Sequence, residues 1–322
     1  MRVLHIAELA TIRVLKEAFA IQQSGTATAI WYKGCAHKGL MGWITFQSTW
    51  TDADQLKAKL RAVSGYDIIH VHTTCTNAAL VTHVRQAADK ASRIIWDMHD
   101  WTPEVKPDEY KHAFDSVLVP SQGYSDSLKA IGIESTVVYS MLPRAWFHPI
   151  TDRLVNAGVL VSGIDSKKGK VWRDYTEAQE KLQAELYVYG AISLSVDGPH
   201  PLHAEYDNLM LTAPYMGLMK QLSKYTFGYA GAGNSRHTIH DCVTNKFWEY
   251  IAAGLPVITF NSDEMSAIVK DQWSGIALDA LDQPWKTPPR KHLAEERFRF
   301  TMETQLPKIM EAYTTVIACD KA

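Results

Sequence analysis

Residues 2–32, RVLHIAELATIRVLKEAFAIQQSGTATAIWY, set the pattern from which the fold is predicted. Residues 2–7 form a short run rich in β-branched side chains, which favours a strand. Residues 14–23 have the apolar spacing of an amphipathic helix, and the Ser24-Gly25 pair is typical of a helix end. Residues 27–32 predict a second strand. A strand, a helix and a strand in this order indicate a βαβ unit in a parallel sheet.

The same alternation continues through the first half of the chain. We expect strands over residues 67–72, 93–98, 117–120 and 136–139, and helices over residues 53–64, 77–91 and 125–130. The first of these helices has Thr51 or Asp52 as its cap. The strands have apolar centres, which suits a sheet covered by helices on both faces.

Residues 143–156, PRAWFHPITDRLVN, interrupt the alternation with two prolines and predict a linker. After it we expect strands over 158–163, 185–189, 209–212, 225–230 and 256–260, and helices over 171–184, 216–224 and 245–253. The final stretch, 290–322, reads as helical, with Pro307 kinking or breaking it. The prediction is an α/β fold with two doubly wound domains, and ligands bind such domains at the carboxyl ends of their strands.

Composition excludes several classes of protein. Hydrophobic residues make up 46% of the 322 and charged residues 21%, which is ordinary for a globular protein. The 33 basic and 35 acidic side chains give a net charge of −2, so no overall field attracts nucleic acid or anionic membrane. The four cysteines show no CxxC spacing and predict free thiols, without structural zinc. His5 and Glu8 interrupt the first apolar run, which argues against a secretory leader, and no run is long enough to span a membrane. We therefore expect a soluble, cytoplasmic protein.

A phosphate-binding helix start is predicted within residues 241–260, DCVTNKFWEYIAAGLPVITF. The helix can begin as early as Val243, which leaves the amides of Val243, Thr244 and Asn245 without partners inside it. These amides and the helix dipole both favour an anion. Lys246 adds a positive charge in the first turn. The segment therefore suits the phosphates of a nucleotide.

Glu249 lies about one turn further into the same helix. Its carboxylate could accept hydrogen bonds from the two hydroxyls of a ribose. The alternative is a solvated or ion-paired glutamate on a helix surface, which is the usual environment of this side chain.

The motif NKFWEYIAAGLPVI resembles the nucleotide-sugar-binding segment of glycosyltransferase family 4, where NK-[LF]-x-E-Y-x-A-x-G-x-P-V-[IV] is common. Other segments are similar to the family in the same order, including DIIHVH, IIWDMHDWTP, VLVPSQGYSDSLKAIGI and WSGIALD. The resemblance covers nearly the whole chain and implies the GT-B fold, in which two Rossmann-like domains face each other across a cleft. Residues 1–148 would form the acceptor-side domain and 149–299 the nucleotide-sugar-binding domain. A C-terminal helix, about 300–322, would pack back on the first domain.

The resemblance also implies roles for acidic residues and a histidine. Glu249 matches the family's ribose-binding glutamate. Asp241, eight residues earlier, matches the acidic residue that faces the donor sugar, although the family usually has glutamate, which is one methylene longer. His99, in DMHD, matches the histidine that faces the donor sugar. His72, the nearer of two strand histidines to the carboxyl end, is a further candidate.

A cationic clamp for the diphosphate is the third implied feature. Lys168, followed by Gly169, is similar to the family's K-G pair in the loop after the first strand of the second domain. The position directly after Gly163, where the family has an arginine, is Ile164 in this sequence. Arg13, at the start of a helix, is either exposed or a contact for an acidic acceptor.

The resemblance implies a glycosyltransferase that takes a sugar from a nucleoside diphosphate, most often UDP. Retention of configuration and independence of metal and cofactor are expected with it. The acceptor stays open among a glycan, a lipid-linked sugar, a protein and a modified DNA base, as in a phage-type enzyme. Two alternatives stay open. One is a nucleotide-sugar epimerase of the same architecture, and the other, which Asp241 and Ile164 favour, is a non-catalytic protein that binds sugar nucleotides or glycans.

Overall fold

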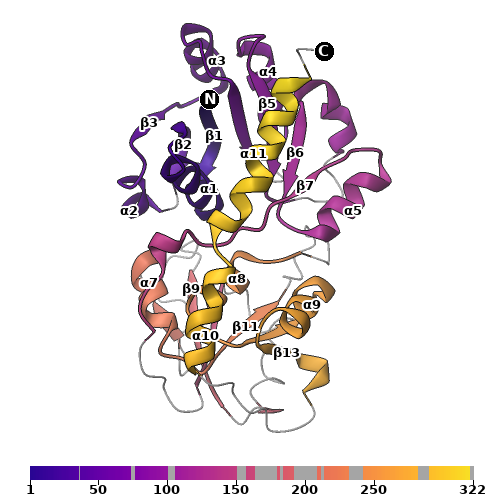
Figure 1. The fold of residues 1–322 in the computed structure, drawn as a ribbon. Coiled ribbons are helices and arrows are strands. Elements are labelled where there is room, and N and C mark those ends of the chain that lie inside the picture. The colour runs from indigo at the N-terminus through magenta and orange to yellow at the C-terminus, as the bar shows by residue number, and fades with distance from the viewer. Residues whose placement is uncertain are drawn as a thin grey trace, which may run out of the picture. The chain divides into compact units, whose positions relative to one another are not determined.

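A computed structural model gives the arrangement of the chain. It describes residues 1–35, 37–73, 77–100, 106–150, 157–163, 180–181, 184–191, 209–211, 214–231, 242–281 and 290–319. These residues form two compact units (Figure 1). Unit 1 consists of Met1–Pro143, Arg236–Cys242 and Met302–Ala322, and unit 2 of Arg144–Ser235 and Val243–Thr301.

Unit 1 is a parallel sheet of seven strands in the order β3-β2-β1-β4-β5-β6-β7. The strands are β1 (Arg2–Ala10), β2 (Ala27–Cys35), β3 (Phe46–Thr49), β4 (Ile68–Thr73), β5 (Arg93–Met98), β6 (Ser116–Val119) and β7 (Thr136–Val137). The helices between them are α1 (Ile12–Gln23), α2 (Lys38–Met41), α3 (Ala53–Ala62), α4 (Ala79–Ala87) and α5 (Gln122–Ala130). The first strand therefore lies in the middle of the sheet, as in doubly wound folds.

Local signals fixed most of these elements correctly. The carboxylate of Asp52 accepts a hydrogen bond from the Gln55 amide at 2.9 Å, which confirms Asp52 as the cap of α3. Helix α5 starts earlier than expected, because Ser121 caps it and accepts from the Tyr124 amide at 3.4 Å. The strand β3 was not expected. It is a four-residue edge strand, and Phe46 at its start is 64% exposed, so it lacks the apolar pattern of the inner strands.

The last helix, α11 (Met302–Ala318), packs on the sheet of unit 1, where it is drawn in yellow beside β5 and β6 (Figure 1). Its side chains Met302, Ile309 and Tyr313 are fully buried in a core with residues of β1, β4, β5 and β6. We expected Pro307 to kink or break the helix; the break is wrong, since α11 runs through this residue. The interruption lies earlier, at the short 3-10 turn Arg297–Arg299 that follows α10 (Arg290–Glu296). Pro307 removes only one amide near the helix start, and it is exposed.

Unit 2 is a second parallel sheet, of six strands in the order β10-β9-β8-β11-β12-β13. The strands are β8 (Ala157–Gly163), β9 (Glu185–Ala191), β10 (Leu209–Leu211), β11 (Phe227–Gly231), β12 (Val257–Phe260) and β13 (Gly275–Ala277). Its helices include α7 (Tyr215–Leu222), α8 (Asn245–Ala252) and α9 (Asp263–Asp271). The helix α9 and the short strand β13 were not expected, and most of the helix expected over 171–184 lies outside the described residues.

Two glycines fix the position of α8. Gly254 has a φ of 68°, the left-handed conformation that ends a helix, and the Leu255 amide then donates to the Tyr250 carbonyl at 2.9 Å. On the helix itself, the ring of Tyr250 lies against Gly228 of β11, where a Cβ would come within 2.3 Å of the ring. Glycine at this point of β11 therefore lets α8 lie close to the sheet.

The two sheets confirm the predicted α/β class with two parallel, doubly wound sheets. Among the described helices, none combines the length and the apolar character needed to cross a lipid bilayer.

Burial of α11 provides a direct test of the packing in unit 1. We expect Ile309→Ala to lower the free energy of unfolding by about 2–5 kcal/mol, because the cavity left in a fully buried core is not refilled. Urea denaturation of unit 1 measures the change. The control is Glu311→Ala, on the exposed face of α11, which should change the value by less than about 0.5 kcal/mol. Equal effects of the two substitutions would contradict the packing.

Candidate functional site

The start of α8 lies at the carboxyl edge of the sheet in unit 2. Strand β8 pairs with β9 on one side and with β11 on the other, so the chain reverses its direction of winding there. Ligands of doubly wound sheets bind at such a point, beyond the carboxyl ends of the strands. Since α8 follows β11 and leads back to β12, its N-terminus faces this edge.

The first turn of α8 offers polar groups to a ligand. Thr244 is the N-cap, and its hydroxyl makes no capping hydrogen bond, so the amides there are not covered by their own cap. The side-chain oxygen of Asn245 is buried and has no hydrogen-bond partner among the described residues. Lys246 is half-buried in the same turn. The helix begins at Asn245, later than the earliest start expected at Val243. Val243 lies before the N-cap and is buried, and a role of its amide in phosphate binding stays a prediction.

Glu249 is buried, with only 3% of its surface exposed, which excludes the alternative of a solvated helix glutamate. Its Oε1 accepts a hydrogen bond of 2.8 Å from the hydroxyl of Tyr215, at the start of α7. Burial foremost, and then the charge of Glu249, raise the pKa of the Tyr215 hydroxyl well above its ordinary value. Tyr215 therefore stays protonated and holds the carboxylate in place.

Two of the predicted site residues are not placed. Lys168 and Asp241 lie outside the described residues, so their roles toward diphosphate and sugar stay predictions.

In unit 1, His99 directly follows β5 at the carboxyl edge of the sheet, and its side chain is 8% exposed. Its Nε2 lies 3.1 Å from Oδ2 of Asp97. Its Nδ1 lies 3.4 Å from the hydroxyl of Thr11, which precedes α1. The predicted histidine is therefore held by Asp97 on one side and has only a long contact with Thr11 on the other, with part of its ring at the surface.

Asp97 is clamped by Arg13. The guanidinium donates to both carboxylate oxygens at 2.9–3.2 Å and to the Val138 carbonyl at 2.8 Å. Arg13 also forms an ion pair of 3.0 Å with Glu17, one turn further along α1. Arg13 is only 2% exposed, so the expectation of an exposed or acceptor-binding arginine was wrong. Its guanidinium is paired inside the fold, with Asp97 and Glu17.

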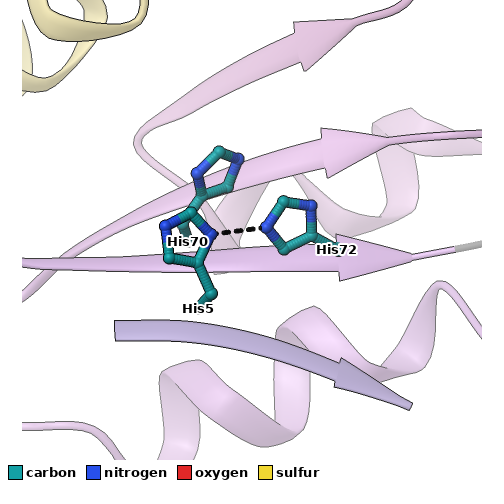
Figure 2. A group of neighbouring side chains, drawn as sticks. All are labelled: His5, His70 and His72. Carbon is teal, nitrogen blue, oxygen red and sulfur yellow. Dashed lines mark hydrogen bonds between the residues drawn. The ribbon is translucent and has the colours of Figure 1, made fainter. Parts of the chain in front are cut away.

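Three histidines continue this polar core into the sheet. His5 and His70 are register partners on β1 and β4, and His72 is two residues further along β4 on the same face. Figure 2 shows the hydrogen bond between Nδ1 of His5 and Nε2 of His72, which are 2.8 Å apart. His72 then reaches Asp97 through Nδ1 at 3.0 Å, while His70 contacts the Tyr313 hydroxyl at 2.7 Å. His72, a candidate for contact with ligand, is only 2% exposed, so its contacts are with buried side chains.

Burial controls the charges in this core. It lowers the pKa of His72 to about 4, against the opposing charge of Asp97, and the pKa values of His5 and His70 also fall well below their ordinary value. Burial raises the pKa of Glu17 well above its ordinary range, only partly offset by Arg13. Burial alone would raise the pKa of Asp97 too, but Arg13 foremost holds it well below its usual value. The three histidines are therefore neutral around one ionised carboxylate.

Potential metal ligands gather in the same core, within the part of the chain that the structure describes. They are His5, His70 and His72, and an overlapping set formed by Glu17, His70, His72 and Asp97. Buried Arg13 and Lys16 already bring two positive charges into this core, so a divalent cation would add uncompensated charge. In addition, the bonded nitrogens of His5 and His72 are 2.8 Å apart, closer than the ~3.3 Å between ligand atoms around a tetrahedral zinc. A hydrogen-bonded network explains this arrangement better than a metal site.

The local sequence did not identify five members of these sites, which are Asp97, Arg13, His5, Glu17 and Tyr215. One signal was present for three of them: a charged or imidazole side chain inside an apolar run, as in RVLHIA, RVLKEAF and RIIWDM. Such residues are almost never fully buried unless they are paired. The partner of each lies far away in the sequence, and no local pattern identifies it.

Comparison with known proteins gives a fold but no close relative. No family model matches the sequence, and no curated protein matches it significantly. AviGT4, a glycosyltransferase involved in avilamycin A biosynthesis, aligns with a TM-score of 0.71 at 11% identity, over 99% of this chain and 98% of that one. HepE from Anabaena, solved in complex with UDP, aligns with a TM-score of 0.68 at 13% identity, over 98% and 100%.

A third similar structure is an alpha-glucosyltransferase in complex with UDP and a DNA 13-mer containing a HMU base. It aligns with a TM-score of 0.66 at 12% identity, over 97% of this chain and 99% of that one. These neighbours are GT-B glycosyltransferases, and the likeness spans both units. At such low identity the likeness shows the fold alone.

The neutral histidines make the stability of unit 1 depend on pH. In the unfolded chain His5, His70 and His72 bind protons below pH 6.5, whereas the folded protein excludes them, so stability is lost as pH falls. Glu17 acts in the opposite sense above pH 4.5, because its raised pKa makes the folded state bind one more proton. The net two protons predict that the free energy of unfolding falls by up to about 3 kcal/mol per pH unit between pH 6 and 5.

Urea titrations at pH 7, 6 and 5 measure this slope. In His5→Gln the slope should decrease by about one proton, or ~1.4 kcal/mol per pH unit. A stability that does not change over this range would contradict the neutral, buried state of the histidines.

Proposed function

We propose that the protein is a GT-B glycosyltransferase that transfers a sugar from a nucleoside diphosphate, most often UDP, to an acceptor. The observation that carries the proposal is the start of α8, where the Thr244 amide, Asn245 and Lys246 precede a buried Glu249 by about one turn. In this segment, a helix start suited to an anion lies next to a carboxylate that can accept hydrogen bonds from hydroxyl groups.

The chemistry of this segment fits a nucleotide. Phosphate oxygens would take the first-turn amides, with Lys246 as a cation, because both the dipole and the donors of a helix start favour an anion. The ribose hydroxyls would donate to the carboxylate of Glu249, which Tyr215 orients. Lys168 is the proposed cation of the diphosphate clamp, and Asp241 the proposed contact to the sugar. Stabilising the charge that grows on the leaving diphosphate is what such a site contributes to transfer.

Unit 1 contributes His99 in this proposal, as the histidine that meets the donor sugar. The ring is held by Asp97 and still has part of its surface exposed. The neighbours add support, because HepE and the alpha-glucosyltransferase were both solved with UDP.

The acceptor stays open among a glycan, a lipid-linked sugar, a protein and a modified DNA base. A modified base is included because one neighbour carries DNA with a HMU base. Membership of glycosyltransferase family 4, retention of configuration, independence of metal and cofactor, and a cytoplasmic location belong to the same proposal.

Nucleotide binding and donor turnover test the function together. We expect UDP to bind in calorimetry, and a UDP-sugar to release UDP when a suitable acceptor is added. Glu249→Gln keeps an acceptor for the Tyr215 hydroxyl but removes the charge, so UDP should bind about 10-fold or more weakly, as for a lost charge-assisted hydrogen bond.

The matched control is Glu295→Gln, an exposed carboxylate on α10, which should bind UDP like the parent protein. Failure to bind UDP, GDP and ADP, with or without a sugar, would contradict the proposal. UDP release without any acceptor would instead indicate an epimerase, and binding without turnover across many acceptors a non-catalytic binding protein.

A further inference from the structure

The two nitrogens of the His99 ring have different surroundings. Nε2 lies in the polar core, 3.1 Å from Oδ2 of Asp97 and 3.0 Å from Nδ1 of His72. Nδ1 lies on the other side, and its described neighbour is the Thr11 hydroxyl at 3.4 Å, a long and therefore weak contact. Nε2 therefore belongs to the buried hydrogen-bond network, whereas Nδ1 lies toward the edge of the sheet.

Asp97 determines which nitrogen carries the proton. The carboxylate is ionised, because Arg13 holds its pKa well below the usual value, and an ionised carboxylate only accepts hydrogen bonds. An unprotonated Nε2 at 3.1 Å would place its lone pair against those of the carboxylate oxygen. A protonated Nε2 donates to it instead. The favoured neutral form of His99 therefore has its proton on Nε2 and a lone pair on Nδ1.

The neighbouring histidines agree with this assignment. His72 also faces Oδ2 of Asp97, through Nδ1 at 3.0 Å, so it too donates from that nitrogen. Its Nε2 is then an acceptor, and it receives the proton of His5 Nδ1 at 2.8 Å. Nε2 of His5 is left without a proton, and it is buried with no hydrogen-bond partner among the described residues. In this set of tautomers Oδ2 of Asp97 accepts from both His72 and His99. The two donor nitrogens, 3.0 Å apart, do not bond each other, and the ring of His72 instead packs edge-on against the ring of His99.

Several contacts fix the position of Asp97, the carboxylate to which these histidines donate. Arg13 binds both oxygens of Asp97 and is itself held by the Val138 carbonyl and by Glu17. These partners come from α1, β5 and the segment after β7, so the position of the carboxylate is fixed by three parts of unit 1. Residues that orient a site are most effective when packing fixes their own position in this way.

We propose that Asp97 and His72 are positioning residues for His99. They hold its ring as the Nε2–H tautomer, so that His99 meets its ligand through Nδ1, as an acceptor for a hydrogen-bond donor such as a sugar hydroxyl. The inference rests on the proposed function only in taking that ligand to be a sugar.

The tautomer of His99 can be read directly by ¹⁵N NMR of the ligand-free, ¹⁵N-histidine-labelled protein at pH 7.5. The chain has 13 histidines, so the signals of His99 are identified by their loss in His99→Gln. We expect long-range couplings that show a proton on Nε2 and none on Nδ1. A proton on Nδ1, or on both nitrogens, would overturn the assignment.

Two variants separate positioning from folding. Asp97→Asn keeps the shape but can turn an NH₂ group toward the imidazoles, so His99 should shift at least partly to the Nδ1–H tautomer. Thr11→Val removes the hydroxyl on the other side and should leave the proton on Nε2. If Asp97→Asn does not fold, His72→Gln replaces it: the proton should stay on Nε2, held by Asp97 alone, while the His99 ring becomes more mobile in ¹⁵N relaxation. An unchanged tautomer in Asp97→Asn, or an unchanged ring mobility in His72→Gln, would overturn the positioning role.

Turnover gives the second readout. We expect Asp97→Asn to lower kcat for a UDP-sugar at least 10-fold while KM changes less than 3-fold, because binding of the nucleotide does not involve unit 1 in this proposal. An Nε2–H tautomer in a protein that turns over no UDP-sugar would contradict the proposed function and leave the positioning intact. Full turnover with His99 in the Nδ1–H form would overturn the positioning alone.

Discussion

The ion pair between Arg13 and Asp97 is the interaction on which the polar interior of unit 1 depends. Removing two charges from water costs several kcal/mol for each ion, and only good geometry with further hydrogen bonds compensates it. Here the guanidinium of Arg13 makes a bidentate contact with Asp97. It also donates to the Val138 carbonyl and forms an ion pair with Glu17. The ionised carboxylate then allows neutral histidines to donate to it. Groups inside the core therefore hold His99, the candidate site residue at the edge of the sheet.

The candidate site of unit 2 depends on different groups. The start of α8 uses backbone amides and a helix dipole, which need no buried charge to be set in place. Its geometry comes from Gly254, which ends the helix, and from Gly228, which lets Tyr250 lie against β11. Glu249 is the exception, a buried acid that accepts a hydrogen bond from Tyr215. Both units therefore place a buried carboxylate at their candidate site.

Much of the fold was readable from local sequence, whereas the polar core was not. Strand β5 was predicted to the residue, and the end of α8 at Gly254 followed from the glycine itself. A doubly wound sheet buries both faces of its strands, so alternation does not tell which face a polar residue such as Asp97 shares with others. Its partner Arg13 is 84 residues away, a pairing that depends on the order of strands in the sheet. The edge strand β3 and the helix α9 were missed because their patterns are short or weak.

In the proposed function, a nucleoside diphosphate binds at the start of α8 with its ribose on Glu249. A crystal structure of the protein grown with UDP tests this arrangement. We expect phosphate oxygens within hydrogen-bond distance of the Thr244 and Asn245 amides, and the ribose hydroxyls on the Glu249 carboxylate. UDP bound elsewhere on the protein, with the start of α8 empty, would contradict it.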